Sequence, residues 1–100
     1  VDDGALPSRF AVSQNRPNPF NPSTTISFAV PENAGQVTLA IFDVSGRLVR
    51  TLESGSLGAG TYTREWNGRD DMGRAVGSGT YFYRLAGNEF SESWKMILIQ

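Results

Sequence analysis

The sequence predicts an all-β protein in which two antiparallel sheets pack face to face. Apolar and polar residues alternate in short runs, and turn residues break these runs roughly every 8 to 12 positions, as in sandwiches and barrels. β-Branched and aromatic residues dominate the runs, which suits strands that present one face to a core. No 11-residue window shows convincing helical periodicity of its apolar residues. About seven strands are therefore expected.

The first half of the chain is expected to contain three of these strands. Residues 10–12 form a short strand after the opening coil. Residues 15–23 include three prolines, which cannot donate ladder hydrogen bonds, so this stretch is predicted to be a stiff crossover between strands. Residues 24–30 and 37–42 alternate cleanly, which places one face of each strand in the core.

The second half is expected to add four strands separated by glycine turns. Ten of the eleven glycines follow residue 34, and glycine permits the tight turns of an antiparallel sheet. Residues 48–53 come after a Ser-Gly turn, and residues 61–66 end at a tryptophan. Residues 80–86 place two tyrosines and a leucine on one face, and residues 90–99 close the chain.

Length and composition indicate one domain, residues 1–100, in which residues 1–8 serve as a linker to an upstream host protein. Cysteine and histidine are absent, which excludes disulfides, thiol nucleophiles and Ser–His dyads. The net charge is −1, with nine basic and ten acidic residues, so no basic surface for nucleic acid is expected. No run approaches the roughly 18 apolar residues of a membrane-spanning helix, and no membrane insertion is predicted.

The loop around Asp70 and Asp71 is the main candidate for chemistry. A glycosidase needs two carboxyl groups across a sugar-binding cleft, and adjacent acids on one loop do not supply them. No catalytic residue, enzyme activity or cofactor is therefore predicted. Oxygen atoms of Asn67, Asp70 and Asp71 could bind calcium, although the EF-hand spacing is missing. The favoured interpretation is turn chemistry, because Asn and Asp bond their own backbone and Gly68 and Gly73 permit positive φ.

Four aromatic side chains could form a platform on which sugar rings stack. They alternate with other apolar residues along their strands, and such stripes belong to the core far more often than to a binding surface. We therefore expect core positions and keep carbohydrate binding as an alternative. The four residues are Trp66, Trp94, Tyr81 and Tyr83.

The last expected strand is apolar on both faces between Met96 and Ile99, directly after the only lysine, Lys95. If Met96 and Leu98 fill the core, Lys95, Ile97 and Ile99 point outward. Two explanations remain open for this second apolar face. Either the proline-rich crossover covers it, or it meets another protein surface. A nearby strand edge could also accept an added strand.

Three blocks of sequence resemble, in the same order, the C-terminal sorting domains of the type IX secretion (Por) system. The first is residues 14–26 (QNRPNPFNPSTTI), and the second is residues 37–49, which end in DVSGRLV. The third lies in pieces between residues 66 and 99, and it also resembles the Ig-like domain of the flagellar hook-capping protein. Asn67 departs from the aspartate that these patterns have at this point. The resemblance covers residues 6–100.

The resemblance implies an immunoglobulin-like sandwich that acts as a non-catalytic C-terminal sorting module. Such a module directs a larger cargo protein in the same chain across the outer membrane of a bacterium. Its partners are the secretion machinery and a sorting peptidase, and the cargo ends secreted or on the cell surface. We expect a monomer. The expected recognition surface consists of Pro17, Asn18, Pro19, Lys95, Ile97 and Ile99.

The alternative function is a carbohydrate-binding or spacer β-sandwich module appended to a secreted hydrolase. The two hypotheses require different surfaces. A sugar-binding module needs an exposed, coplanar pair of aromatic rings, whereas a sorting module needs an accessible apolar terminal strand.

Overall fold

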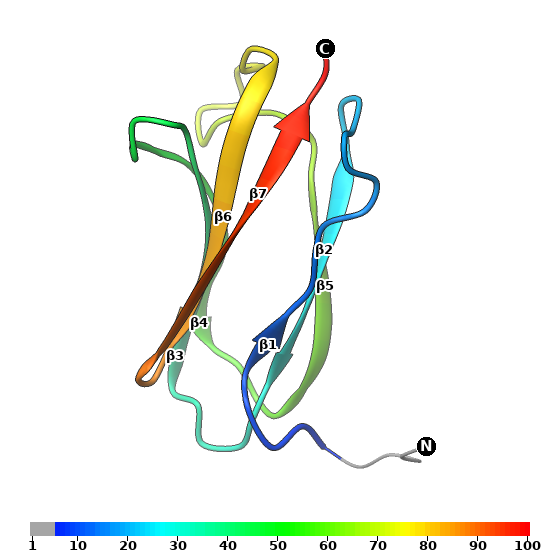
Figure 1. Ribbon diagram of the computed structural model, residues 1–100. Helices are drawn as coiled ribbons and strands as arrows, with labels where there is room; N and C mark the ends of the chain where they lie inside the picture. Colours follow the sequence, from blue (N-terminus) through cyan, green and yellow to red (C-terminus); the bar gives the residue numbers. More distant parts are fainter. Residues whose placement is uncertain (1–5) are drawn as a thin grey trace.

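The computed structural model describes residues 6–100, in which seven strands form two antiparallel sheets packed face to face (Figure 1). One sheet has the strand order β1-β2-β5 and the other the order β4-β3-β6-β7. The predicted all-β, immunoglobulin-like sandwich is confirmed. This described part contains no helix long and apolar enough to cross a membrane. The strands are β1 (Ala11–Val12), β2 (Thr24–Val30), β3 (Gln36–Phe42), β4 (Leu48–Ser56), β5 (Gly60–Trp66), β6 (Gly79–Gly87) and β7 (Phe90–Leu98).

Strand boundaries agree closely with the sequence prediction except at β4. This strand continues to Ser56, whereas the predicted strand ended at residue 53. Its last residues pair with the beginning of β3, where Gln36 lies opposite Ser56. Two register shifts between β3 and β4 also break the alternation of β4. Of the expected linker, residues 1–5 lie outside the described residues.

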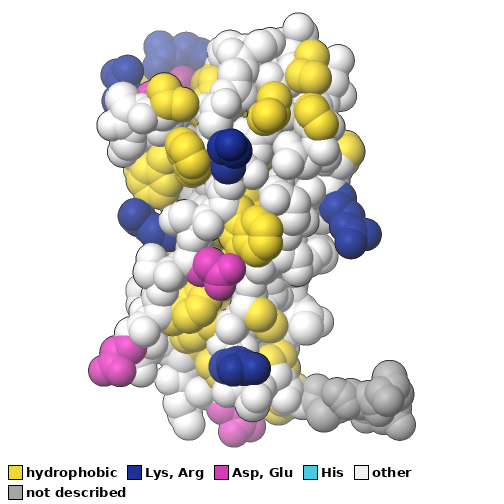
Figure 2. Space-filling model, viewed as in Figure 1, with side chains coloured by type: hydrophobic (Ala, Val, Ile, Leu, Met, Phe, Trp, Pro, Cys, Tyr) yellow, Lys and Arg dark blue, Asp and Glu magenta, His cyan; other side chains and the backbone are white. Residues whose placement is uncertain are grey.

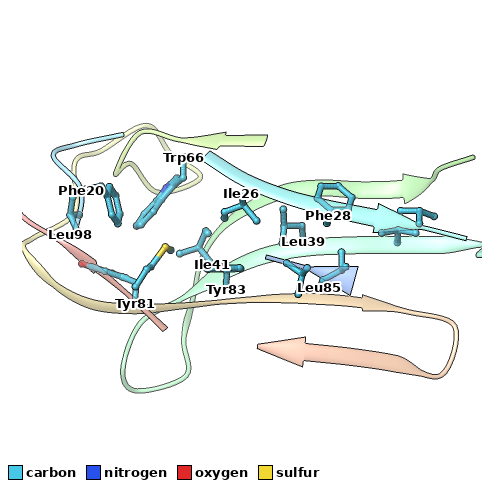
Figure 3. Close-up of a cluster of buried hydrophobic side chains, with 14 of the residues drawn as sticks. Phe20, Ile26, Phe28, Leu39, Ile41, Trp66, Tyr81, Tyr83, Leu85 and Leu98 are labelled. Carbon is cyan, nitrogen blue, oxygen red and sulfur yellow. The ribbon is translucent and has the colours of Figure 1, made fainter. Parts of the chain in front are cut away.

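The core lies between the two sheets and consists of the alternating apolar positions that the sequence indicated (Figure 3). Ile26 of β2, Leu39 of β3 and Leu85 of β6 are fully buried. Tyr83 is also fully buried, and its hydroxyl donates a 2.6 Å hydrogen bond to the Ser13 carbonyl. Burial raises the pKa of Tyr83 from 10.0 to about 12. This tyrosine therefore connects the four-stranded sheet to the chain just after β1.

The proline-rich crossover between β1 and β2 is held by a small buried polar cluster. The side-chain amide of Asn15 is 1% exposed and donates to Thr24 Oγ1 at 2.9 Å and to the Pro17 carbonyl at 3.1 Å. The Thr24 hydroxyl donates to the same carbonyl at 2.8 Å. Phe20 anchors the far end of the crossover, because its ring is buried 5.7 Å from the ring of Trp66. The predicted crossover is confirmed, and it is fixed against the sandwich at both ends.

Candidate recognition surface

The crossover runs along the outer edge of β7, the edge strand of the four-stranded sheet. The Phe20 N–H donates to the Ile97 carbonyl at 3.0 Å, and the Ile99 N–H donates to the Phe20 carbonyl at 2.8 Å. The Asn18 side-chain oxygen accepts the Ile97 N–H at 2.9 Å, and the Gln14 amide donates to the Lys95 carbonyl at 3.0 Å. The two sequence segments predicted to form the recognition surface are therefore joined in space.

These hydrogen bonds occupy the outward backbone groups of β7 from the Lys95 carbonyl to the Ile99 N–H. The expectation that this edge could accept an added strand is therefore wrong for this part of β7. Another strand could pair here only after displacing the crossover. Because an unpaired edge is a template for unwanted association, the crossover also protects the sheet from it.

The outward side chains of β7 remain accessible although its backbone edge is covered. Ile97 is 39% exposed and Ile99 49% exposed, while Met96 and Leu98 lie in the core at 0% and 1%. Lys95 is exposed as well. The structure thus combines the two explanations that the sequence left open. The crossover covers the strand edge, and the apolar face beside it stays available to another surface.

The crossover side of this surface consists of Pro17, Asn18 and Pro19, all of which are exposed. The side chains of Asn15 and Thr24 fix the position of this segment, because both donate hydrogen bonds to the Pro17 carbonyl. Asn18 has a structural role in addition to its exposure, since its side-chain oxygen bonds β7. Sequence reasoning did not identify Asn15. A single polar residue in a connection belongs to no alternating pattern, so nothing in the sequence indicated that its side chain is buried.

Sequence reasoning also missed apolar side chains that lie beside Lys95 on the outer face of the sheet. Phe82 of β6 is directly opposite Lys95, and Phe42 of β3 is directly opposite Phe82. Tyr81 and Tyr83 indicated the core face of β6. Phe82 lies between them and therefore points to the opposite, outer face. Figure 2 shows hydrophobic side chains exposed at several places in both the upper and the lower half of the visible surface.

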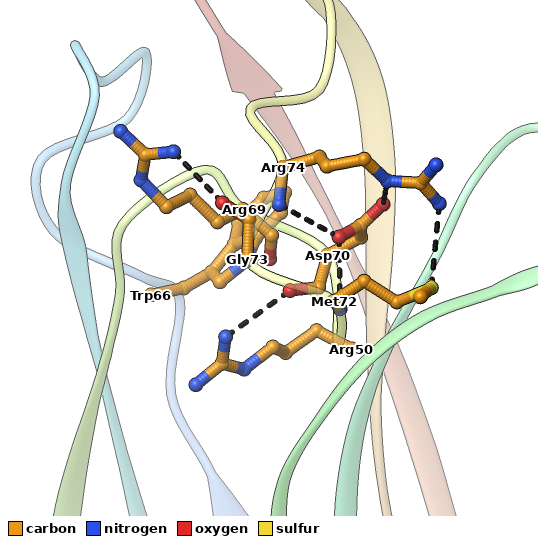
Figure 4. Close-up of polar contacts among 7 residues, drawn as sticks. All are labelled: Arg50, Trp66, Arg69, Asp70, Met72, Gly73 and Arg74. Carbon is orange, nitrogen blue, oxygen red and sulfur yellow. Dashed lines mark hydrogen bonds and ion pairs between the residues drawn. The ribbon is translucent and has the colours of Figure 1, made fainter.

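The Asp70 loop forms a turn built around one carboxylate (Figure 4). Asp70 Oδ1 accepts the Met72 and Arg74 N–H groups, each at 2.9 Å, and Oδ2 lies 3.3 Å from Arg74 Nε. The backbone hydrogen bond from Arg74 contributes most to lowering the Asp70 pKa below its usual value. The predicted turn chemistry is confirmed. Gly73 adopts a φ of +83°, as the turn requires.

The same construction occurs in the turn between β3 and β4. Asp43 Oδ1 accepts the Ser45 N–H at 2.9 Å and the Arg47 N–H at 3.0 Å. A hydrogen bond from the Ser45 hydroxyl contributes most to lowering the Asp43 pKa. The two turns share the sequence Asp-x-x-Gly-Arg, so a short repeated motif fixes two loops in the same way.

Asp71 connects the Asp70 loop to β4. Its Oδ1 accepts the Thr51 N–H at 3.0 Å and lies 3.9 Å from Arg50 Nε. The Arg50 guanidinium in turn donates to the Asp70 carbonyl at 3.2 Å. The two carboxylates therefore bind different parts of the backbone. Between residues 6 and 100, no three acidic, histidine or cysteine side chains gather as a metal site would require.

The aromatic residues considered for sugar stacking lie in the core. Trp66 and Tyr83 are 0% exposed and Tyr81 is 8% exposed, and the half-buried Trp94 packs against the same cluster. Trp66 Nε1 donates to the Arg69 carbonyl at 2.8 Å, which closes the loop over the end of the core. The predicted core positions are confirmed, and these four residues provide no exposed pair of rings.

Comparison with protein families gives a match over most of the chain. The family described as the FlgD Ig-like domain matches residues 14–89. The basal-body rod modification protein FlgD of Salmonella typhimurium is 41% identical over 59 residues, which is 59% of this chain and 25% of that protein. The chain thus spans about a quarter of the length of this curated relative.

Two solved structures from Porphyromonas gingivalis contain a similar fold. The dimeric latent form of PorU superposes with a TM-score of 0.70 at 26% identity, over 99% of this chain and 10% of PorU. PorZ, described as an essential bacterial surface component of the type IX secretion system, gives a TM-score of 0.60 at 26% identity. This match covers 91% of the chain and 11% of PorZ.

Proposed function

This chain belongs to the family of FlgD Ig-like domains, and on that premise we propose that it is a non-catalytic sorting module for type IX secretion. The likeness to PorU and PorZ supports this proposal, because it extends over 99% and 91% of the chain. The matched part is only about a tenth of either protein, as suits a small module in a longer chain. The sequence resemblance of residues 6–100 to the Por sorting domains points to the same function.

The proposed module acts on a larger cargo protein in the same chain. It delivers that cargo through the outer membrane by contact with the secretion machinery. A sorting peptidase then completes attachment to the cell surface or release. In this proposal the module is a monomer without a cofactor, and any catalysis belongs to the cargo.

The observation that carries the proposal is the joining of the crossover to β7. Pro17 and Pro19 stand on one side, and Lys95, Ile97 and Ile99 on the other, with hydrogen bonds between the two backbones. The surface offers apolar contact and one ammonium group on a rigid support. A receptor can dock on such a surface without unfolding the domain, since the contact side chains already point outward.

The experiment is secretion of a reporter protein fused to this chain in a host with the type IX system. The double variant Ile97→Thr/Ile99→Thr keeps β-branched residues on the strand and removes outward apolar surface. We expect export to fail while the melting temperature stays within a few degrees, because both side chains are partly exposed. The matched control is Met72→Thr, which removes an apolar side chain that is 77% exposed in a distant turn.

Three results would count against the proposal. The first is retention of the wild-type fusion inside the cell, and the second is export of the double variant at the level of Met72→Thr. Unfolding of the double variant would also contradict it, since the outward face would then contribute to the core.

The likeness to Salmonella FlgD favours a second candidate, a part in modification of the flagellar basal-body rod. The test is to replace the corresponding segment of that FlgD by this chain. Restored motility together with failed reporter export would favour this candidate. The carbohydrate-binding alternative is not supported, because the aromatic residues considered for sugar stacking lie in the core. Micromolar binding of a soluble polysaccharide in calorimetry would be needed to support this alternative.

A further inference from the structure

A row of apolar side chains crosses the outer face of the four-stranded sheet. Leu48 of β4 lies opposite Phe42, Phe42 opposite Phe82, and Phe82 opposite Lys95. Directly opposed residues of antiparallel strands point to the same face. Leu48 is 49% exposed, and both phenylalanines are half-buried. The recognition surface on β7 therefore continues across the sheet, and we call this continuation the outer sheet face.

The charged strand residues of the outer sheet face all have one sign. Arg84 of β6 and Lys95 of β7 point outward, and the outward positions of the four strands carry no acidic residue. Within residues 6–100, no carboxylate lies within ion-pair distance of either cation. Four other arginines do have such partners, namely Arg47, Arg50, Arg64 and Arg74. The outer sheet face thus has positive charge that this chain does not neutralise.

Arg84 is arranged to receive an acidic group. Its guanidinium carbon lies 4.6 Å from the centre of the Phe42 ring, and stacking on a ring leaves the N–H donors of arginine available for a carboxylate. Beside it is a shallow depression of about 380 Å³ lined in part by Phe42, Val44, Phe82 and Ser93. Asp43 also lines this depression, and its carboxylate accepts hydrogen bonds from Ser45 and Arg47 of its own turn. Apolar walls and a stacked cation therefore lie in one place.

We propose that the outer sheet face docks a partner segment that is both acidic and apolar, an extended peptide with carboxylates beside aliphatic side chains. This inference rests on the proposed function, because the segment would belong to the secretion machinery. The unpaired cations favour an acidic partner, and the row of apolar side chains supplies contact area. A depression this shallow suits a chain lying along the surface.

The test is an NMR titration of the ¹⁵N-labelled chain with a blocked octapeptide of alternating Glu and Leu. We expect shifts confined to the outer sheet face and weaker binding at higher salt, since exposed charges are screened. Octapeptides of alternating Lys and Leu, and of alternating Glu and Ser, should bind at least about tenfold more weakly, a difference near 1.4 kcal/mol.

Arg84→Glu should weaken binding of the Glu-Leu peptide about tenfold, since attraction becomes repulsion. Arg84→Lys keeps the charge and should retain most of the affinity. Arg69→Glu is the matched control, because it makes the same change of charge at an exposed loop position. Equal binding of the Lys-Leu peptide, shifts elsewhere on the molecule, or equal effects of Arg84→Glu and Arg69→Glu would overturn the inference.

Reporter export separates this inference from the proposed function. Arg84 is outside the surface tested by Ile97→Thr/Ile99→Thr, so Arg84→Glu examines the outer sheet face alone. If the wild-type fusion is exported and Arg84→Glu is exported equally well, the inference is wrong and the proposed function stands. If the wild-type fusion is not exported, the proposed function fails, and the peptide titration alone decides the inference.

Discussion

Replacing Trp66 by alanine should remove the aromatic side chain that closes one end of the sandwich. Trp66 is 0% exposed and lies 5.7 Å from the ring of Phe20 and 5.3 Å from the ring of Tyr81. Its indole N–H also holds the Arg69 carbonyl of the following loop. The substitution therefore empties a site that is shared by the crossover, β6 and the Asp70 loop.

The expected loss of stability is about 3–6 kcal/mol. Truncation of a buried aromatic residue to alanine costs about 3–5 kcal/mol, including the cavity. The lost hydrogen bond to Arg69 adds at most about 1 kcal/mol, because water can reach a loop carbonyl. A domain of this size has a total stability of about 5–15 kcal/mol, so Trp66→Ala brings the protein close to unfolding.

Urea unfolding followed by far-ultraviolet circular dichroism measures this loss without depending on tryptophan fluorescence. Trp66→Phe provides a second variant that should remain folded. It keeps much of the ring contact and loses the N–H donor, so a cost of about 1–2 kcal/mol is expected. An unchanged urea midpoint for Trp66→Ala would refute the reasoning. Equal costs for the two variants would show that the hydrogen bond, and not packing, holds this end of the core.

Three further predictions concern single residues. Gly87→Ala should cost about 1–3 kcal/mol, because a Cβ at Gly87 would clash with the Phe10 ring. The cost should disappear in a Phe10→Ala background, and a cost that persists there in urea unfolding would contradict the clash. Asn15→Ala should cost about 2 kcal/mol of folding stability. It should also speed hydrogen exchange of the Phe20 and Ile99 amides, and unchanged exchange would show that the crossover is held without Asn15. Because the Tyr83 pKa rises from 10.0 to about 12 on folding, the unfolded chain loses this proton first and stability should fall as the pH rises from about 10 to 12. Tyr83→Phe should lose that part of the pH dependence, and an unchanged alkaline profile would remove Tyr83 as its cause.

Local alternation was sufficient to predict the strands and most of the core. The pattern around Ile26, Phe28 and Val30 identified β2 with its observed limits, Thr24–Val30, because every second side chain is buried. The same reasoning placed Met96 and Leu98 inward and Ile97 and Ile99 outward, as observed. The predicted β4 was three residues too short, because Ser54, Gly55 and Ser56 pair regularly with β3 but carry no apolar side chain to mark the strand.

Relations between distant segments could not be predicted in this way. Nothing local to Asn18 or Phe20 specifies that their hydrogen bonds end at Ile97 and Ile99, because that pairing depends on how the sheets are assembled. The outer sheet face was missed for the same reason. Phe42 and Phe82 become neighbours only through the pairing of β3 with β6.

The pairing of the crossover with β7 also sets an order of events during synthesis. Asn18 and Ile97 are separated by 79 positions, so the crossover has no partner at this edge until nearly all of the domain has been translated. Closing a loop of this length lowers chain entropy before the contact stabilises anything, and such distant contacts slow folding. Translation that stops before Lys95 would leave the crossover undocked and the edge of β6 uncovered between Gly79 and Phe82. A nascent chain at that stage should be sensitive to proteases and prone to associate through the open edge.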